Sequence, residues 1–248
     1  MSLIQVKDLR KVYRIEQERV VALNRINLEI DRGEICCILG TSGSGKSTLL
    51  NIMAGLEKPS RGQVLIDGRD VTAMGERELA LFRQENVGFI FQSYNLMPTL
   101  TAVENVAMPL MFRGIDKKIR TKEAKKMLKA VGLAERMKHR PTQMSGGQQQ
   151  RVGIARAFVA KPKIVFADEP TGNLDSHTTL EVMEMIVRMA REHNETLILV
   201  THDQEIARYA DRIIRLVDGA VISDEPNESI IGPETGDDEH ESKETGEK

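Results

Sequence analysis

The amino-acid sequence predicts an α/β protein with a mostly parallel sheet. Short apolar runs alternate along the chain with longer segments whose apolar residues recur at helical spacing, and no internal repeat is present. This alternation is typical of strands joined by helices that pack on the sheet. The chain has 248 residues, which corresponds to one large domain or two small ones. A chain of this length can bury most of its apolar surface without disulfides or metals.

The elements follow from the two kinds of apolar spacing. The apolar runs predict strands at residues 4–9, 22–30, 35–39, 63–66, 87–91, 164–167, 197–200 and 212–216. The amphipathic segments predict helices at residues 46–54, 76–83, 121–131, 147–160, 176–193 and 203–210. Asp218-Gly219 stands between apolar residues and indicates a β-hairpin. The mostly helical stretch at about 93–162 predicts a helical subdomain inserted into the α/β core.

The cysteines and the apolar runs exclude two classes of protein. Cys36 and Cys37 are the two cysteines of the chain, too few for a disulfide framework. They are adjacent in a predicted strand, so they should point to opposite faces and serve as buried packing. No run approaches the ~18 apolar residues of a membrane-spanning helix, and the first residues lack the apolar region of a signal peptide. We therefore expect a soluble intracellular protein that reaches a membrane only through a partner.

Charge is distributed unevenly along the chain. Residues 224–248 carry ten acidic residues against two lysines, a net charge of −8, whereas residues 1–223 carry a net charge of +6. We expect this acidic tail to be disordered, because it has too few apolar residues to repay the entropy of ordering; a functional acidic tail is the alternative. The lysines at 117–126 are interpreted as the solvated face of a helix, and no nucleic-acid partner is predicted.

The strongest motif is a glycine-rich loop between a predicted strand and a predicted helix. It consists of Gly40, Thr41, Ser42, Gly43, Ser44, Gly45, Lys46, Ser47 and Thr48. This is the spacing of a P-loop, in which backbone N–H groups and the helix N-terminus surround the phosphates of a nucleoside triphosphate. We expect Lys46 to contact the β- and γ-phosphates and Ser47 to bind Mg²⁺. A glycine- and serine-rich turn without a ligand would not require the flanking strand and helix.

A second acidic strand end completes such a site. Asp168 and Glu169 follow four apolar residues that indicate a buried parallel strand, where carboxylates without a role are costly. We expect Asp168 to hold Mg²⁺ through water and Glu169 to polarise the water that attacks the γ-phosphate. A charged pair that merely ends an edge strand is the alternative.

A further anion site is predicted about 100 residues after the P-loop. Ser145, Gly146 and Gly147 open a predicted helix, and Gln148 continues it. With the P-loop and the acidic strand, this run resembles the ATP-binding-cassette (ABC) family, in which such a signature in one subunit binds the γ-phosphate held by the P-loop of another. Met144 stands where the family usually has leucine, a change that preserves apolar character and volume.

The resemblance covers roughly residues 2–222 and implies roles for other residues. Tyr13 resembles the aromatic residue that stacks on adenine, and Gln92 resembles the glutamine that contacts Mg²⁺ and water and couples the core to the helical insert. Asp175 belongs to a loop that resembles the one crossing the dimer interface. His202 resembles the histidine that contacts the γ-phosphate. Taken alone, a single tyrosine or histidine at these positions would be interpreted as structural.

The resemblance implies a complete architecture and an activity. We expect residues 1–223 to form one ATPase domain, with a P-loop core and an antiparallel β subdomain near the N-terminus. Residues 224–248 form the acidic tail. Two copies should close head to tail on two ATP molecules with Mg²⁺, with ATP binding driving closure and hydrolysis releasing it. Each composite site would take the P-loop, Gln92, Asp168, Glu169 and His202 from one copy. The other copy would contribute Ser145, Gly146, Gly147 and Asp175.

Two segments, residues 91–106 and 167–175, resemble one subgroup of the family. This subgroup contains the ATPases of macrolide-export, lipoprotein-release, cell-division and antimicrobial-peptide-resistance systems. The resemblance implies an ATPase that drives an integral membrane permease with about four spans and lies on the inner face of the cell membrane. The alternatives are a soluble ABC ATPase of DNA repair or translation and a non-hydrolysing regulatory binder. The sequence does not identify the transported substrate, its direction or the role of the tail.

Overall fold

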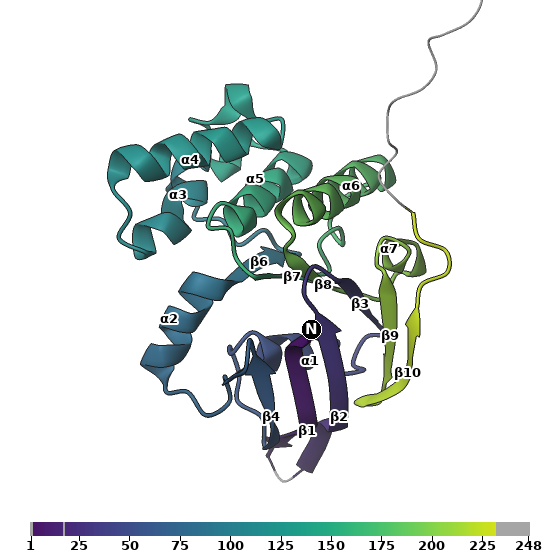
Figure 1. Cartoon of the computed structure of the whole chain (residues 1–248). Helices are drawn as coiled ribbons and strands as arrows, with labels where there is room; N and C mark the ends of the chain where they lie inside the picture. The colour runs from purple at the N-terminus through teal and green to yellow at the C-terminus, as the bar shows by residue number, and fades with distance from the viewer. Residues whose placement is uncertain (1, 17, 232–248) are drawn as a thin grey trace, which may run out of the picture.

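The computed structural model describes residues 2–16 and 18–231, which form two sheets and a group of helices (Figure 1). Within these residues the main sheet has six strands in the order β10-β9-β3-β8-β7-β6. Their bounds are β3 Ile35–Leu39, β6 Val87–Phe91, β7 Ile164–Asp168, β8 Thr196–Thr201, β9 Arg212–Val217 and β10 Ala220–Pro226. Neighbours from β9 to β6 are parallel, and β10 returns antiparallel to β9 through the predicted hairpin at Asp218-Gly219. The predicted α/β class with a mostly parallel sheet is confirmed.

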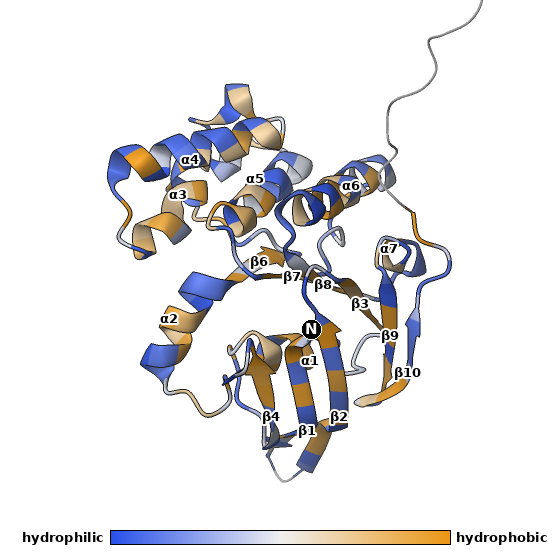
Figure 2. Cartoon of the chain, in the orientation of Figure 1, coloured by the Kyte–Doolittle hydropathy of each residue, from blue (hydrophilic) through white to orange (hydrophobic). Residues whose placement is uncertain are grey.

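The second sheet forms the predicted antiparallel subdomain near the N-terminus. In the described residues its strands follow the order β2-β1-β4-β5. Their bounds are β1 Ser2–Ile15, β2 Glu18–Asp31, β4 Arg61–Ile66 and β5 Arg69–Asp70. Figure 2 shows hydrophilic and hydrophobic residues alternating along β1 and β2, the pattern of a sheet with one buried face. Both strands are longer than the apolar runs alone predicted, because their outer ends pair outside the core.

The helices flank the main sheet and form the inserted subdomain (Figure 1). Their bounds are α1 Lys46–Met53, α2 Glu76–Asn86, α3 Ala102–Phe112, α4 Lys117–Ala130, α5 Gly146–Phe158, α6 Ser176–His193 and α7 Gln204–Ala207, with 3-10 turns at Ala134–Arg136 and Pro141–Gln143. Of these α-helices, α3 was not predicted. Thr101 and Glu104 form a capping box at its start, but Pro109 interrupts the helical pattern and the apolar residues are not confined to one face.

The main sheet separates two groups of buried apolar residues. Successive residues of a strand point to opposite faces, and Cys36 and Cys37 of β3 follow this rule. Cys37 packs with the helical subdomain and α6, whereas Cys36 packs with α1 and the antiparallel sheet. Both thiols are buried and free, and burial raises the pKa of Cys37 to about 12. Their predicted role as buried packing is confirmed.

The predicted start of the disordered tail at residue 224 is wrong. Asp224 lies inside β10, where its carboxylate pairs with the Arg212 guanidinium at 2.5 and 2.6 Å. Asn227 is buried and donates its side-chain amide to Ala210 O at 2.7 Å, and the Ile231 N–H donates to Arg208 O at 2.9 Å. These contacts fix residues 224–231 against β9 and α7, although the segment has few apolar side chains. The remaining tail, 232–248, lies outside the described residues.

Glu195 is a buried carboxyl at the end of the sheet where β8 begins. It is 4% exposed, and neither carboxyl oxygen has a hydrogen-bond partner among the described residues. Burial raises its pKa to about 8, which the nearby Lys161 only partly opposes. The folded chain therefore holds this proton at neutral pH, where the unfolded chain has released it.

This proton makes stability depend on pH in a defined direction. Between the ordinary carboxyl pKa of 4.5 and the raised value of about 8, the folded chain binds more protons than the unfolded chain. The free energy of unfolding should therefore fall as pH rises through this window, by up to about 1.4 kcal/mol per pH unit. Glu195→Gln should remove this contribution, so that the variant gains stability over the native chain as pH rises. Thermal melts of both proteins at several pH values measure the difference; parallel pH profiles would contradict it.

Candidate functional site

The predicted phosphate loop lies at the end of β3 and opens into a pocket of about 630 Å³. β3 is buried along its whole length, and α1 begins directly at Lys46. The residues that line the pocket are Ala22, Thr41, Ser42, Gly43, Gly45, Lys46, Ser47, Thr48, Gln92, Glu169 and His202. The structure thus brings the P-loop together with the residues that directly follow β6, β7 and β8, namely Gln92, Glu169 and His202. These residues were predicted to share one site.

Two glycines give the loop its shape. Gly43 and Gly45 have φ values of +81° and +102°, in the left-handed region that side chains disfavour. At Gly45 a Cβ atom would also lie 2.4 Å from the backbone oxygen of Ala22, so a side chain would force the loop away from β2. These positions let the backbone N–H groups turn toward one point.

Lys46 and Ser47, at the start of α1, place an ammonium group and a hydroxyl group beside the phosphate loop and the Asp168 carboxylate. The Lys46 ammonium, in a residue that is 7% exposed, donates to Thr41 O at 2.8 Å across the loop. The Ser47 hydroxyl donates to Asp168 Oδ1 at 3.2 Å. A hydroxyl and a carboxylate so close together are hard oxygen donors, and Mg²⁺ in phosphate sites typically uses one or two such protein ligands with water and phosphate. The residues present therefore fit Mg²⁺.

The position of Asp168 disfavours the charged form of its carboxyl group. Burial raises its pKa above the ordinary value; the Ser47 hydrogen bond opposes the rise and the neighbouring Glu169 carboxylate adds to it. A divalent cation next to the two carboxylates would reverse this balance.

Glu169 is held in a fixed orientation by the end of β8. Its backbone has a φ of +46°, a left-handed conformation that is strained for a non-glycine residue. Thr201 Oγ1 donates to one carboxylate oxygen at 3.2 Å, and His202 Nδ1 lies 2.8 Å from the other. Because an ionised carboxylate can only accept, Nδ1 carries the proton in this pair. Glu169 and His202 therefore act as a hydrogen-bonded unit.

Gln92 links this pocket to the loop before α6. Its side chain lines the pocket directly after β6, and its backbone oxygen accepts from Asn173 Nδ2 at 2.9 Å. At Gly172 a Cβ atom would lie 2.7 Å from Gln92 Nε2. A side chain at this position would therefore collide with the Gln92 amide.

Tyr13 is near the pocket but does not line it. Its hydroxyl donates to Glu57 Oε2 at 2.8 Å and lies 3.4 Å from Thr48 Oγ1, which does line the pocket. The Lys11 ammonium is 5.0 Å from the centre of the tyrosine ring. The predicted stacking of Tyr13 on adenine stays a prediction.

The predicted signature residues form a separate pocket of about 450 Å³. Ser145, Gly146, Gly147 and Gln148 at the start of α5 lie there with Asn173, Leu174 and Asp175 before α6. Ser145 caps α5 by accepting from Gln148 N at 3.3 Å, and Asp175 caps α6 by accepting from Thr178 N at 3.0 Å. At Gly147 a Cβ atom would lie 2.7 Å from Thr178 Cγ2, so glycine allows the two helix starts to approach. The pocket thus combines two helix N-termini.

Several residues around both pockets were not singled out from the sequence. Gln150 is fully buried and donates to Pro170 O, which joins α5 to the loop after β7. Arg156 donates to Tyr94 O at 2.9 Å and also to Asn95 O, and so holds the loop after Gln92. Thr201, which donates to Glu169, precedes His202 in the sequence, and no role was predicted for it. Without the fold, no spacing rule connects these residues to their partners.

Comparisons with known proteins agree with this geometry. The family model described as ABC transporter matches residues 23–172. The lipoprotein-releasing system ATP-binding protein LolD of Geobacter metallireducens is 48% identical over 223 residues, covering 90% of this chain and 99% of that protein. The macrolide export ATP-binding/permease protein MacB of Shewanella sp. strain ANA-3 is 48% identical over 225 residues, but this chain covers only 34% of its length.

Solved structures show the same fold. The ATP-binding cassette MJ0796, in a dimeric post-hydrolysis state bound to ADP and Pi, matches with a TM-score of 0.84 and 43% identity, covering 90% of this chain and 98% of that one. In this chain no described helix is long and apolar enough to cross a membrane. From the two helix-start pockets, the family model and these relatives, we conclude that the chain belongs to the ABC transporter family and is an ATP-binding domain of that family.

Proposed function

We propose that the chain hydrolyses ATP as a head-to-tail homodimer and that this hydrolysis drives a membrane permease. The observation that carries the proposal is the separation of the two pockets. Among the described residues, the P-loop pocket and the signature pocket share no lining residue. Each contains backbone N–H donors at a helix start, the arrangement that binds phosphate. Two incomplete anion sites in one chain become two complete sites when two copies pair about a twofold axis.

The residues of the P-loop pocket divide the work of hydrolysis. The loop backbone and Lys46 bind the β- and γ-phosphates of ATP, and Ser47 and Asp168 hold Mg²⁺, with Gln92 at the edge of the same pocket. When bound, Mg²⁺ neutralises charge that develops on the phosphates. Glu169 orients and polarises the attacking water, and His202 keeps its carboxylate in place. From the partner copy, Ser145, Gly146 and Gly147 supply N–H and hydroxyl donors to the γ-phosphate, while Gln148 and Asp175 complete the signature side.

The proposed dimer is supported by a relative. The cassette MJ0796, which has the same fold and is 43% identical, was captured as a dimer with ADP and Pi. Binding that favours the closed pair, followed by hydrolysis that removes the γ-phosphate, would convert chemical energy into opening and closing.

A groove beside the nucleotide pocket is suited to the permease. It has a volume of about 600 Å³ and is mostly apolar, with Leu56, Leu81, Phe89, Phe91 and Phe112 among its lining residues. Leu56, Leu81 and Phe112 are 49%, 51% and 64% exposed, a patch that a protein partner would cover.

The groove is rigid and connected to the site. Arg113, directly after α3, donates to Gln84 O at 2.8 Å, Glu85 O at 2.9 Å and Ala160 O at 2.6 Å, so one side chain joins α2, α3 and the end of α5. Phe89 and Phe91 of β6 line the groove, and the next residue, Gln92, lines the nucleotide pocket. A displacement of Gln92 would therefore shift Phe91 and change the contacts of a partner bound in the groove.

We further propose that the system belongs to the release and efflux type, and that the chain lies on the inner face of the cell membrane with a permease of about four spans. LolD and MacB, which are about half identical to this chain, are named for lipoprotein release and macrolide export. The alternative, a soluble ATPase of DNA repair or translation, would call for a long coiled coil or a second cassette. The longest described helix between Lys46 and Asp168 has 14 residues.

Glu169→Gln should separate binding from chemistry. It keeps the size of the side chain but removes the carboxylate, so ATP hydrolysis should fall by at least about 100-fold while ATP binding persists. Lys46→Ala should instead weaken ATP binding itself. Size-exclusion chromatography with ATP should show the Glu169→Gln chain as a stable dimer, because the substitution removes a negative charge beside the γ-phosphate. Glu192→Gln, at the exposed far end of α6, is the control and should behave as native; native hydrolysis by Glu169→Gln would exclude its role.

Mixing two inactive variants tests the composite site. Homodimers of Lys46→Ala lack both P-loop halves, and homodimers of Ser145→Arg lack both signature halves. A mixed dimer keeps one complete site, so an equal mixture should recover roughly a quarter of the native rate, since half of randomly paired dimers are mixed. Circular dichroism must show both variants folded. If the mixture of folded variants stays inactive, head-to-tail pairing is wrong.

Charges in the groove should disconnect the permease without affecting the site. Leu81→Glu with Phe112→Glu places carboxylates where apolar contacts are proposed, and burying them uncompensated is costly. Co-purification with the membrane protein encoded in the adjacent reading frame should fall at least about tenfold, while ATP hydrolysis by the isolated chain changes little. Ile222→Glu on β10 is a control, because Ile222 is 62% exposed, close to the 64% of Phe112. Undiminished co-purification of the double variant would place the partner elsewhere.

A further inference from the structure

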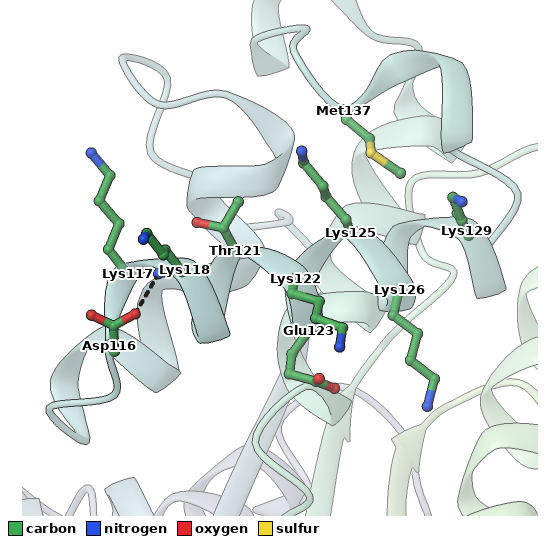
Figure 3. A pocket seen from close by; sticks show the side chains of 10 residues that line it. All are labelled: Asp116, Lys117, Lys118, Thr121, Lys122, Glu123, Lys125, Lys126, Lys129 and Met137. Carbon is green, nitrogen blue, oxygen red and sulfur yellow. Dashed lines mark hydrogen bonds between the residues drawn. The ribbon is translucent and has the colours of Figure 1, made fainter.

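The exposed face of α4 carries a dense group of lysines. All six lysines of α4 line one hollow of about 930 Å³ on the helical subdomain (Figure 3). These six, here called the lysine face, are Lys117, Lys118, Lys122, Lys125, Lys126 and Lys129. Figure 3 shows their side chains extending away from the helix. In contrast, Ala124 and Leu128 on the other side of α4 are buried in the core.

Within residues 2–16 and 18–231, few opposite charges lie close to the lysine face. None of the six ammonium groups forms an ion pair or a side-chain hydrogen bond with a residue that the structure describes. Two carboxylates, Asp116 and Glu123, line the same hollow. The Asp116 carboxylate is already used as the cap of α4, because it accepts from Lys118 N at 2.8 Å. The hollow therefore presents a net positive charge to solvent.

The lysine face also has apolar neighbours. Ile119 of α4 is 55% exposed, and Met137 lines the hollow beside the lysines. A basic helix face with an exposed isoleucine on the same helix is suited to the headgroup region of an anionic membrane.

The position of α4 relative to the groove points to the same partner. α3 ends at Phe112 in the groove, and α4 begins at Lys117 after a short turn. The turn is fixed, since Ile115 N donates to Leu110 O at 3.0 Å and Arg120 Nη1 donates to Ile115 O at 3.0 Å. A permease seated in the groove would therefore lie close to the start of α4, where the lysine face begins.

We propose that the lysine face docks on an anionic lipid surface beside the permease. This inference rests on the proposed function, because the permease is what places α4 near the membrane. The acidic C-terminal tail is a less suitable occupant. Ile231, the last described residue, lies next to α7, where its N–H donates to Arg208 O at 2.9 Å, while Figure 1 shows α4 at the opposite edge of the helical layer beyond α5. Contact between residues 232–248 and α4 would require closing a loop across the helical layer, at a cost in entropy.

Vesicle binding by the full chain tests the proposal. The probe is phosphatidylcholine vesicles with roughly 30 mol% phosphatidylglycerol, compared with pure phosphatidylcholine. The native chain should sediment with the anionic vesicles and not with the neutral ones. Binding should be lost as the salt concentration rises from about 0.1 M to about 1 M, where the Debye length falls from about 10 Å to about 3 Å.

A charge-matched pair of variants locates the surface. Replacing Lys118, Lys122, Lys125 and Lys126 by glutamine should reduce vesicle affinity about fivefold per lysine, and more than about a hundredfold in all. The control replaces Lys7, Arg10, Arg14 and Arg19 by glutamine, four exposed cations on β1 and β2, and should bind as native. Equal loss in both variants, or equal binding to neutral vesicles, would overturn the proposal.

Two further measurements distinguish other outcomes. If the full chain does not bind anionic vesicles but a chain ending at Ile231 does, the acidic tail occupies the lysine face and the proposal is overturned. Preference for a DNA duplex over vesicles would overturn it in favour of nucleic acid. ATP hydrolysis, which the lysine variant should retain, is measured in parallel. If the native chain does not hydrolyse ATP, the proposed function is rejected. If it hydrolyses ATP but does not bind anionic vesicles, only the lipid contact is rejected.

Discussion

The structure depends on a close backbone contact that holds the P-loop between two other segments. Gly40 lies so near the end of β9 that a Cβ atom there would be 2.3 Å from Leu216 O, and Gly45 is similarly pressed on Ala22 O of β2. Gly219 in the β9–β10 hairpin donates to Ser44 O at 3.0 Å and accepts from Asn24 N at 2.8 Å. The antiparallel sheet and the C-terminal hairpin therefore meet on the phosphate loop. A binding site made of backbone N–H groups needs this support, because it has no side chains of its own to fix its shape.

Parallel pairing then delivers the remaining site residues to the same edge of the sheet. In the observed register Leu39 is opposite Thr201, and Asp168 is opposite both Val200 and Phe91. The residues that follow these positions are Gly40, His202, Glu169 and Gln92. Strands that run in the same direction end together, so a short distance in space replaces a separation of more than a hundred residues in the sequence. The hydrogen bonds of Glu169 to Thr201 and His202 are a direct result of this register.

The helical subdomain is tied to this edge by a few polar contacts. Asn173 donates to Gln92 O, and Gln150 donates to Pro170 O, so the loops after β6 and β7 are both in contact with the region that carries the signature. The lysine face lies on this subdomain, and the apolar groove lies where the end of α3 meets α2 and β6 of the core. The helical insert thus has its nucleotide-facing side and its proposed membrane-facing side on different surfaces. This arrangement would let a change at the γ-phosphate move a partner that never touches the nucleotide.

The α/β class, the P-loop, the acidic pair after β7 and the positions of most strands along the chain could be predicted from the amino-acid sequence. These features depend on local backbone geometry and on apolar periodicity, which each segment carries alone. The tertiary structure decided the rest. Helix α3 forms despite Pro109 because it packs against α4 and α5, Gln150 is buried because α5 lies against the loop after β7, and residues 224–231 are held by Arg212 and Ala210. Each of these outcomes depends on contact with another element of the fold, and a single sequence contains no local signal for a contact that only folding creates.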